Sequence, residues 1–227
     1  MSDLTIIYYT ANTIPGQFAY AIRSNLIQAS MLVPKVWISK KPLPVTTFGS
    51  QYIVVNTPRS HLNIYRDALT GAKVAKTKYI ALAEDDVLYS PEHFKYRPAP
   101  GKFAYNLGCW GLYTWSDPPM FSWKGRRNLC NLICERELFI EAIEERFAKH
   151  GDSVDLSIWA EPGKYESQLG VTVRETETFW TNPPNVMFSH ETALAYQNLG
   201  TRKKVGELRA YSVPYWGEAK EVRRLYR

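Results

Sequence analysis

The stretch TKYIALAEDDVLYSPEHF, residues 77–94, begins as an apolar strand and ends in three consecutive acids. Residues 79–83 (YIALA) form an uninterrupted apolar run, which is typical of a strand buried on both faces of a sheet. Glu84, Asp85 and Asp86 follow directly. Neighbouring carboxylates raise one another's pKa and destabilise a fold unless a cation or a basic partner offsets their repulsion. The stretch therefore predicts a central strand that ends at a site for positive charge.

Strands and helices alternate through the first 86 residues. Runs rich in β-branched and aromatic residues predict strands, and apolar residues at helical spacing predict helices. The predicted strands are LTIIYY (4–9), KVWISK (35–40), YIVVN (52–56) and YIALA (79–83), and the predicted helices are QFAYAIRSNLIQAS (17–30) and HLNIYRDALTGAKVAK (61–76). Ser60 is available to cap the second helix. This order predicts an α/β domain with a largely parallel sheet and right-handed crossovers.

The second half of the chain is less regular. Residues 90–124 are rich in Pro, Gly and aromatic residues, and FAYNLGCWGLYTW (103–115) within them predicts short strands. RNLCNLICERELFIEAIEERFAKH (127–150) predicts a strand that runs into a helix ending near Gly151. No internal repeat or low-complexity linker interrupts the sequence, so a single domain with a mixed sheet is expected.

Composition limits the class of protein. The chain has 227 residues, 45% of them apolar, which is enough for a substantial core. No apolar run is long enough to span a bilayer, and MSDLTIIYYT lacks the features of a signal peptide. The three cysteines fit a reducing compartment, and the spacing of Cys130 and Cys134 does not complete a zinc site. We therefore expect a cytoplasmic protein that makes no contact with a membrane.

Most of the positive charge lies at the C-terminus. The formal net charge is +6, and residues 201–227 hold eight basic and three acidic residues, a net +5. Tyr211, Tyr215, Trp216 and Tyr226 are interleaved with these cations. Phosphates bind cations and aromatic rings offer stacking faces, so the segment suits a polyanion with exposed bases or sugars. A solvated tail that only aids solubility explains the same composition equally well.

The three acids predict a metal site. Ligands of open α/β sheets bind beyond the carboxyl ends of the parallel strands, and Glu84, Asp85 and Asp86 follow such an end. Hard divalent ions take oxygen ligands, and Mg²⁺ or Mn²⁺ is commonly held by one or two carboxylates together with substrate phosphates. The acids therefore indicate a divalent metal and a phosphorylated ligand. An exposed acidic turn without a function is the alternative.

The same residues carry a family resemblance. AKTKYIALAEDDVLY (75–89), preceded by HLNIYRDALTG (61–71), resembles the signature of nucleotide-sugar-dependent glycosyltransferases of the GT-A fold. The resemblance implies a GT-A-like, Rossmann-type sheet that is mixed but mostly parallel and is flanked by helices. It also implies that Asp86 binds the Mn²⁺ or Mg²⁺ ion that bridges the diphosphate of the donor, and that Glu84 and Asp85 hold the rest of the donor.

Two further segments resemble parts of this family. LTIIYYTAN (4–12) is similar to its first strand and the loop that cups the nucleotide base, which implies that Thr10, Ala11 and Asn12 lie near the nucleoside. PNVMFSH is similar to a late strand that delivers a histidine to the metal, which implies that His190 is a ligand. A hydrogen-bonded structural histidine is the alternative for His190.

The C-terminal segment has an implied role in this fold. The resemblance divides the chain into a catalytic domain, residues 1–200, and a basic, aromatic segment, residues 201–227, that packs on or closes over the active site. Arg202, Lys203 and Lys204 are then expected to bind the diphosphate of the nucleotide sugar.

The catalytic base is less well defined. GDSVDLSIWAEPGKY (151–165) resembles the acceptor-side segment of inverting enzymes, but Ser153 stands where the family has the catalytic acid. Serine cannot serve as that base, so Asp152 or Asp155 takes the role, or the enzyme retains configuration and has no conventional base. Capping a helix is the alternative role for both aspartates.

Two classes of acceptor and two other functions are to be considered. HETALAYQNLGTRKK (190–204) is similar to small phage-type enzymes that glycosylate hydroxymethylated pyrimidines in DNA, which implies hydroxymethylcytosine in DNA as acceptor. A saccharide or protein hydroxyl is an alternative. A non-catalytic nucleic-acid-binding module is another, and it predicts no dependence on metal. A nucleotidyltransferase is less favoured, because no Gly-rich basic loop follows the first strand.

Overall fold

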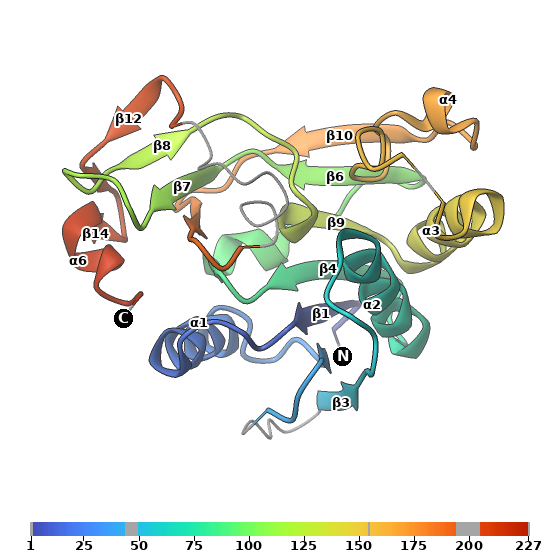
Figure 1. Ribbon diagram of the computed structural model, residues 1–227, viewed down its shortest axis with the longest axis horizontal. Helices are drawn as coiled ribbons and strands as arrows, with labels where there is room; N and C mark the ends of the chain where they lie inside the picture. The colour runs from blue at the N-terminus through green and yellow to red at the C-terminus, as the bar shows by residue number, and fades with distance from the viewer. Residues whose placement is uncertain (1, 44–49, 154, 194–204, 227) are drawn as a thin grey trace.

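The computed structural model describes residues 2–43, 50–153, 155–193 and 205–226 (Figure 1). In these residues the centre of the protein is a seven-stranded sheet in the order β10-β6-β9-β4-β1-β2-β3. Its strands are β1 (Leu4–Thr10), β2 (Lys35–Ser39), β3 (Ser50–Val54), β4 (Tyr79–Glu84), β6 (Lys102–Asn106), β9 (Leu132–Glu135) and β10 (Glu175–Phe179). β9 runs antiparallel to β4 and β6, and the other neighbouring strands are parallel. The predicted class, an α/β domain with a mixed, mostly parallel sheet flanked by helices, is confirmed.

Three long helices cover the sheet. α2 (His61–Val74) and α3 (Arg136–His150) pack against each other and against one face, while α1 (Gly16–Ala29) covers the other (Figure 1). Alternate residues of β4, the middle strand, contribute to the two faces: Ile80 belongs to the cluster under α2 and α3, and Ala81 belongs to the cluster under α1. The central strand is therefore buried on both sides, as its apolar run predicts.

Helix boundaries follow the sequence signals. The Ser60 side chain accepts a hydrogen bond of 3.1 Å from the backbone N–H of Asn63, which confirms the predicted N-cap of α2. α3 ends at His150, and the next residue, Gly151, has a φ of 55°, a conformation that glycine adopts at little cost.

A second, five-stranded sheet was not predicted as a separate layer. Its order is β12-β8-β7-β11-β5, with strands β5 (Val87–Leu88), β7 (Cys109–Tyr113), β8 (Phe121–Trp123), β11 (Asn185–Ser189) and β12 (Leu208–Ala210). Leu112, Phe121 and Phe188 from this sheet pack against Phe18 and Ile22 of α1. The short-strand prediction for residues 103–115 is confirmed by β6 and β7, and the sequence PNVMFSH contains β11.

The described part of the C-terminal segment belongs to this second layer. β12 pairs with β8, and the short elements β13 (Ser212–Val213), β14 (Gly217–Glu218) and α6 (Ala219–Arg223) follow. Val213, Ala219 and Val222 are buried in the same cluster as Phe18. Residues 205–226 are thus packed on the domain, while closure over an active site stays a prediction.

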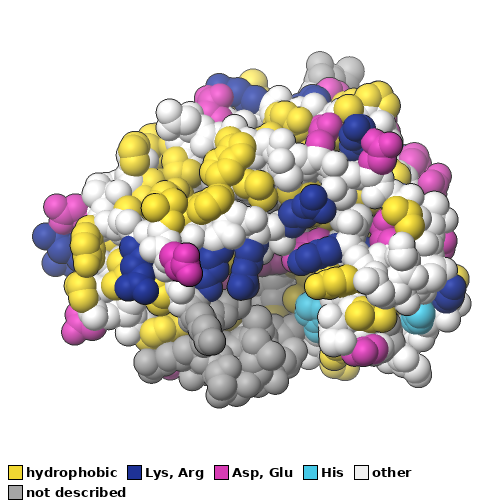
Figure 2. Space-filling view, turned by 90° about the horizontal axis from the view of Figure 1, so that it is seen from above, with side chains coloured by type: hydrophobic (Ala, Val, Ile, Leu, Met, Phe, Trp, Pro, Cys, Tyr) yellow, Lys and Arg dark blue, Asp and Glu magenta, His cyan; other side chains and the backbone are white. Residues whose placement is uncertain are grey.

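The surface is uneven in charge and polarity. Figure 2 shows Lys and Arg side chains in a band across the middle of one face, beside a group of hydrophobic side chains. Within the residues that the structure describes, every helix is too short or too polar to cross a bilayer.

Candidate functional site

A cavity of about 230 Å³ lies beyond the carboxyl ends of β1 and β4, where the crossover helices of an α/β sheet diverge. Residues that follow β1, β4 and β11 form its wall, together with the start of α2. Of the residues predicted to bind metal or donor, the wall contains Thr10, Ala11, Glu84, Asp85, Asp86 and His190. The fold therefore gathers residues separated by up to 180 positions into one pocket.

Glu84 and Asp85 are each held by a hydroxyl from β1. The Tyr9 hydroxyl donates a hydrogen bond of 2.6 Å to Glu84 Oε1, and the Thr10 hydroxyl donates to Asp85 Oδ2. Burial is the main cause that raises the pKa of Asp85 to about 6, and the neighbouring Asp86 charge adds to it. The predicted repulsion between the acids therefore contributes to the raised pKa of Asp85, but burial contributes more.

Asp86 and His190 face each other across the pocket wall. His190 Nε2 lies 3.3 Å from Asp86 Oδ2, and His190 Nδ1 lies 2.9 Å from Thr192 Oγ1. The backbone also joins the two segments, because Phe188 N–H donates a hydrogen bond of 2.8 Å to the Asp86 carbonyl. A residue bound by Thr192 through one ring nitrogen presents the other nitrogen in a fixed direction.

The donor set fits a divalent metal ion. Asp86 Oδ1 is buried and has no hydrogen-bond partner among the described residues, which is costly unless a ligand satisfies it. Carboxylate oxygen and imidazole nitrogen are both ligands of divalent metals. In the described part of the chain no group of three or more His, Cys, Asp and Glu side chains is arranged to hold an ion. Asp86 and His190 would thus hold Mn²⁺ or Mg²⁺ together with oxygens of a bound diphosphate.

The loop after β1 shapes the nucleoside end of the pocket. Thr10 and Ala11 line the cavity, whereas Asn12 does not. Asn12 has a φ of 51°, and its N–H donates a hydrogen bond of 2.7 Å to Thr10 Oγ1, so it turns the chain after the strand. The position predicted for Asn12 is thus adjacent to the pocket, and its binding role stays a prediction.

The pocket also contains an ion pair that the sequence analysis missed. Lys40 Nζ lies 2.6 Å from Asp67 Oδ2, and both side chains are nearly buried in the wall. Burial raises the pKa of Asp67, and the hydrogen bond from Lys40 opposes this increase. Lys40 is the last residue of the predicted strand KVWISK and directly follows β2, so its place at the carboxyl end of a parallel strand could have indicated a pocket residue.

Asp152 and Asp155 are not brought to this pocket. Asp152 pairs with Arg66 at 2.5 Å, its side chain is 77% exposed, and it does not line the cavity. Asp155 accepts a hydrogen bond of 2.8 Å from the N–H of Ser157, which lowers its pKa, and it is exposed as well. Residues 156–158 form a turn and not a helix, so Asp155 binds a turn N–H while Asp152 pairs with Arg66, and the helix-capping alternative is not seen for either residue. The catalytic role of either aspartate stays a prediction. Arg202, Lys203 and Lys204 lie outside the described residues.

Glu161, from the same segment, does line the cavity. Its side chain is 20% exposed, and its Oε2 lies 3.4 Å from Lys164 Nζ. Glu161 was not predicted as a site residue, since nothing in the local sequence pattern separates it from other loop acids. Its location follows from long-range contacts of the loop that carries it.

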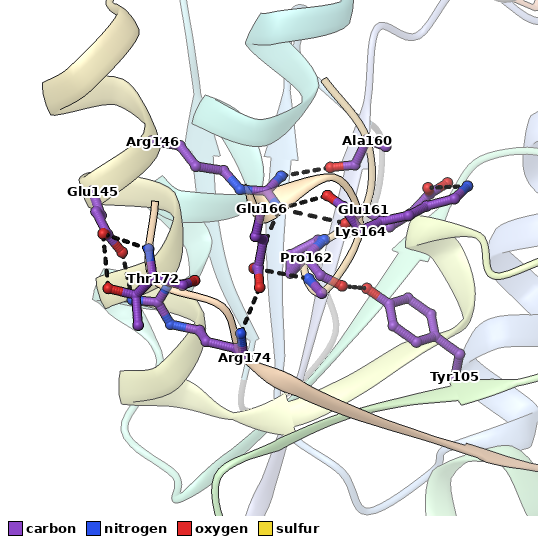
Figure 3. A network of polar contacts seen from close by, with 11 residues as sticks. Tyr105, Glu145, Arg146, Ala160, Glu161, Pro162, Lys164, Glu166, Thr172 and Arg174 are labelled. Atoms are coloured by element: carbon purple, nitrogen blue, oxygen red, sulfur yellow. Dashed lines mark hydrogen bonds and ion pairs between the residues drawn. The ribbon is translucent and has the colours of Figure 1, made fainter. Parts of the chain in front are cut away.

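A buried arginine anchors that loop (Figure 3). Arg146 of α3 is fully buried, and its Nη1 donates a hydrogen bond of 2.6 Å to the Ala160 carbonyl. Its Nη2 lies 3.4 Å from Glu166 Oε1, and Glu166 in turn accepts a hydrogen bond of 2.9 Å from Gly163 N–H. Figure 3 also shows the Tyr105 hydroxyl bound to the Pro162 carbonyl. Polar contacts on both sides therefore fix the loop and, with it, Glu161.

No protein-family model and no curated protein sequence matches this chain. Several solved structures have a similar overall path of the backbone. A glycosyltransferase involved in the glycosylation of the major capsid of PBCV-1 has 9% identity and a TM-score of 0.46 over 87% of this chain and 97% of that chain. A nucleotidyl transferase from Methanothermobacter has 11% identity and a TM-score of 0.44 over 77% and 86% of the two chains. HddC from Yersinia pseudotuberculosis has 11% identity and a TM-score of 0.46 over 82% and 93%. At these values the likeness says nothing about the activity of this chain.

Proposed function

We propose that this protein is a metal-dependent glycosyltransferase that moves a sugar from a nucleotide-diphosphate sugar to an acceptor hydroxyl. One observation carries the proposal: Asp86, with a buried oxygen that lacks a partner in the described residues, faces His190 in a cavity beyond the carboxyl ends of β1 and β4. A carboxylate and an imidazole in this position suit an ion that needs further oxygens from a diphosphate. The alternatives of an acidic turn and a structural histidine leave the Asp86 oxygen unexplained.

Different residues of the pocket bind the metal ion and the donor. Asp86 and His190 hold the metal ion, which when bound offsets negative charge on the diphosphate. Glu84 and Asp85, oriented by the hydroxyls of Tyr9 and Thr10, hold the ribose and sugar of the donor. Preorganised polar groups of this kind lower the barrier because they need no rearrangement during the reaction.

Glu161 acts as the general base in this proposal. It removes the proton from the acceptor hydroxyl, whose oxygen then bonds to the anomeric carbon while the bond from that carbon to the diphosphate oxygen breaks. The products are the glycosylated acceptor, the nucleoside diphosphate and a proton held on Glu161. A base on the acceptor side supports attack opposite the leaving group and hence inversion of configuration. Glu161 is favoured over Asp152 and Asp155 because it lines the cavity.

We further propose DNA that carries hydroxymethylated pyrimidines as the acceptor. This assignment is supported by the basic and aromatic C-terminal segment, of which Tyr211 and Tyr215 are largely exposed. A polyanionic acceptor also suits the overall net charge of +6. A saccharide or protein hydroxyl would use the same donor site with a different acceptor surface.

The test is release of nucleoside diphosphate from a panel of UDP- and GDP-sugars. Reactions contain Mn²⁺ or EDTA, with and without duplex DNA that carries hydroxymethylcytosine. We expect release that requires both the metal and the modified DNA and that is lost in Asp86→Asn. Asp3→Asn, which removes a surface carboxylate paired with Arg97, is the matched control and should keep full activity. Release that ignores DNA would redirect the search for an acceptor, and absence of release from every donor would contradict the proposed function.

A further inference from the structure

A second cavity, of about 320 Å³, lies between the end of β7 and α6. Three cations, a hydroxyl and an aromatic ring line it: Lys220, Arg223, Arg224, Thr114 and Tyr226. None of these residues was predicted to bind the donor or the metal. A concave site with this lining is suited to an anion.

We propose that this second cavity binds a backbone phosphate of the acceptor nucleic acid. The inference rests on the proposed function, because it assigns an acceptor site to the same enzyme. Arg223 supplies the fixed element: its Nη1 donates a hydrogen bond of 2.8 Å to the Ser116 carbonyl, which holds the guanidinium at the cavity. A planar guanidinium with several N–H donors matches the geometry of phosphate oxygens.

Among the described residues, the contacts that hold the other two cations lie at the surface. Lys220 Nζ lies 2.8 Å from Glu218 Oε2, and Arg224 pairs with Glu221 one turn away. Both cationic side chains are more than half exposed. Exposed pairs of this kind are worth about 0 to 1 kcal/mol, so an incoming phosphate can replace the carboxylates at little cost.

Residues that line the two cavities contact each other. Tyr226 lines the second cavity, and the centre of its ring lies 5.3 Å from that of His190, which lines the first. Thr114 also lines the second cavity, and its N–H donates a hydrogen bond of 3.1 Å to the carbonyl of Ser189, the neighbour of His190. A strand whose phosphate is bound beside Tyr226 therefore passes close to the pocket that holds the donor.

The surroundings favour a nucleic acid over other polyanions. Tyr211 and Tyr215, in the segment that leads into α6, are 65% and 66% exposed, and such rings can stack on bases. Lys124 lies 5.8 Å from the centre of the Tyr113 ring, next to Thr114, and extends the positive charge along β7 and β8. Cations combined with exposed rings are typical of nucleic-acid surfaces.

The experiment measures binding of a fluorescein-labelled duplex DNA by fluorescence anisotropy over a range of NaCl concentrations. The variant is Lys220→Gln/Arg224→Gln, which leaves Arg223 and the core in place. We expect weaker binding and a slope of log K against log [NaCl] that is less steep by about 0.9, since the cavity binds one phosphate and each lost phosphate contact contributes about 0.9. The control Lys73→Gln/Lys95→Gln removes two exposed, ion-paired lysines outside the cavity and should keep the wild-type slope.

Two further measurements separate this inference from the proposed function. The affinity for UDP and GDP in the presence of Mn²⁺, measured by calorimetry, should be equal in the wild type and the cavity variant. Unchanged DNA affinity and salt slope in that variant would overturn the inference, as would wild-type protein that binds heparin but not DNA. In both of these cases, nucleotide binding by the wild type would still support the proposed donor site. If the wild type binds neither UDP nor GDP, the result counts against the proposed glycosyltransferase itself.

Discussion

Glu161 and Asp152 lie nine positions apart, yet only one of them reaches the candidate active site. A general base must come within hydrogen-bonding distance of the proton that it removes. Asp152 is 77% exposed and paired with Arg66, whereas Glu161 lines the cavity that contains the acids. Position therefore favours Glu161, although the family resemblance favours the earlier aspartates.

We predict that Glu161→Gln lowers kcat by about 10²-fold to 10⁴-fold and leaves KM for the donor nearly unchanged, because a general base contributes to the chemical step. Gln keeps the size and polarity of the side chain but cannot accept the proton. Steady-state release of nucleoside diphosphate at saturating acceptor measures the effect. Asp152→Asn and Asp155→Asn serve as controls and should retain activity. The opposite result, with Asp152→Asn inactive and Glu161→Gln active, would restore the base implied by the resemblance.

The site was predictable to the extent that local sequence fixes it. Glu84, Asp85 and Asp86 follow a recognisable buried strand, and His190 follows another, so both strand ends identify pocket residues. Glu161 was not predictable, because its place depends on Arg146, which binds the loop from α3. A contact between a loop and a distant helix leaves no periodic signal in the sequence.

At the scale of elements, the close approach of α2 to β1 sets one wall of the pocket. α2 carries Tyr65 and Asp67 into the cavity, and Gly71 lies on its buried side. A Cβ atom built on Gly71 would lie 2.3 Å from Ile7 Cγ2, inside van der Waals contact. Ile7 is fully buried in β1, so its branched side chain has little freedom to move.

We predict that Gly71→Ala lowers the free energy of unfolding by up to about 2 kcal/mol. Overpacking a core costs about 1 to 3 kcal/mol, and the better helix propensity of alanine returns about 1 kcal/mol. Gly16→Ala, at the start of α1, is the matched control, because nothing lies within 4 Å of its added Cβ atom. Urea denaturation of both variants measures the difference. Equal stability of the two variants would mean that α2 moves away from β1 without cost.

Elements of the first half were predictable because each has a strong periodicity bounded by turns. β1, β2, β4, α1 and α2 lie where the pattern predicts them, and β3 is displaced by two residues from the predicted 52–56. The second sheet was not predictable as a layer. Its strands are two to five residues long, and β11 pairs with β7, which lies far away in the sequence. The second sheet is therefore defined by which strands pair and not by local sequence patterns.

For the whole molecule, a buried amine makes stability depend on pH. Lys35 begins β2 and is 4% exposed, and its Nζ donates hydrogen bonds of 3.0 and 2.8 Å to the carbonyls of Ser30 and Val33. Burial lowers the pKa of Lys35 to about 8, against about 10.4 for an unfolded chain. Between these values the unfolded chain binds a proton that the folded protein has lost. Stability linked to this group is therefore present at high pH and is lost as the pH falls through 8.

We predict that raising the pH from 7.5 to 9.5 increases the free energy of unfolding of the wild type, relative to Lys35→Met, by about 2 kcal/mol. Met fills a similar volume without a titrating group, so other ionisations cancel in the comparison. Urea denaturation at both pH values gives the measurement, and Lys76→Met, at an exposed lysine, should follow the wild-type profile. Parallel pH profiles for the wild type and Lys35→Met would show that the amine keeps its proton inside the fold, where its two carbonyl partners would have to offset the full cost of burying the charge.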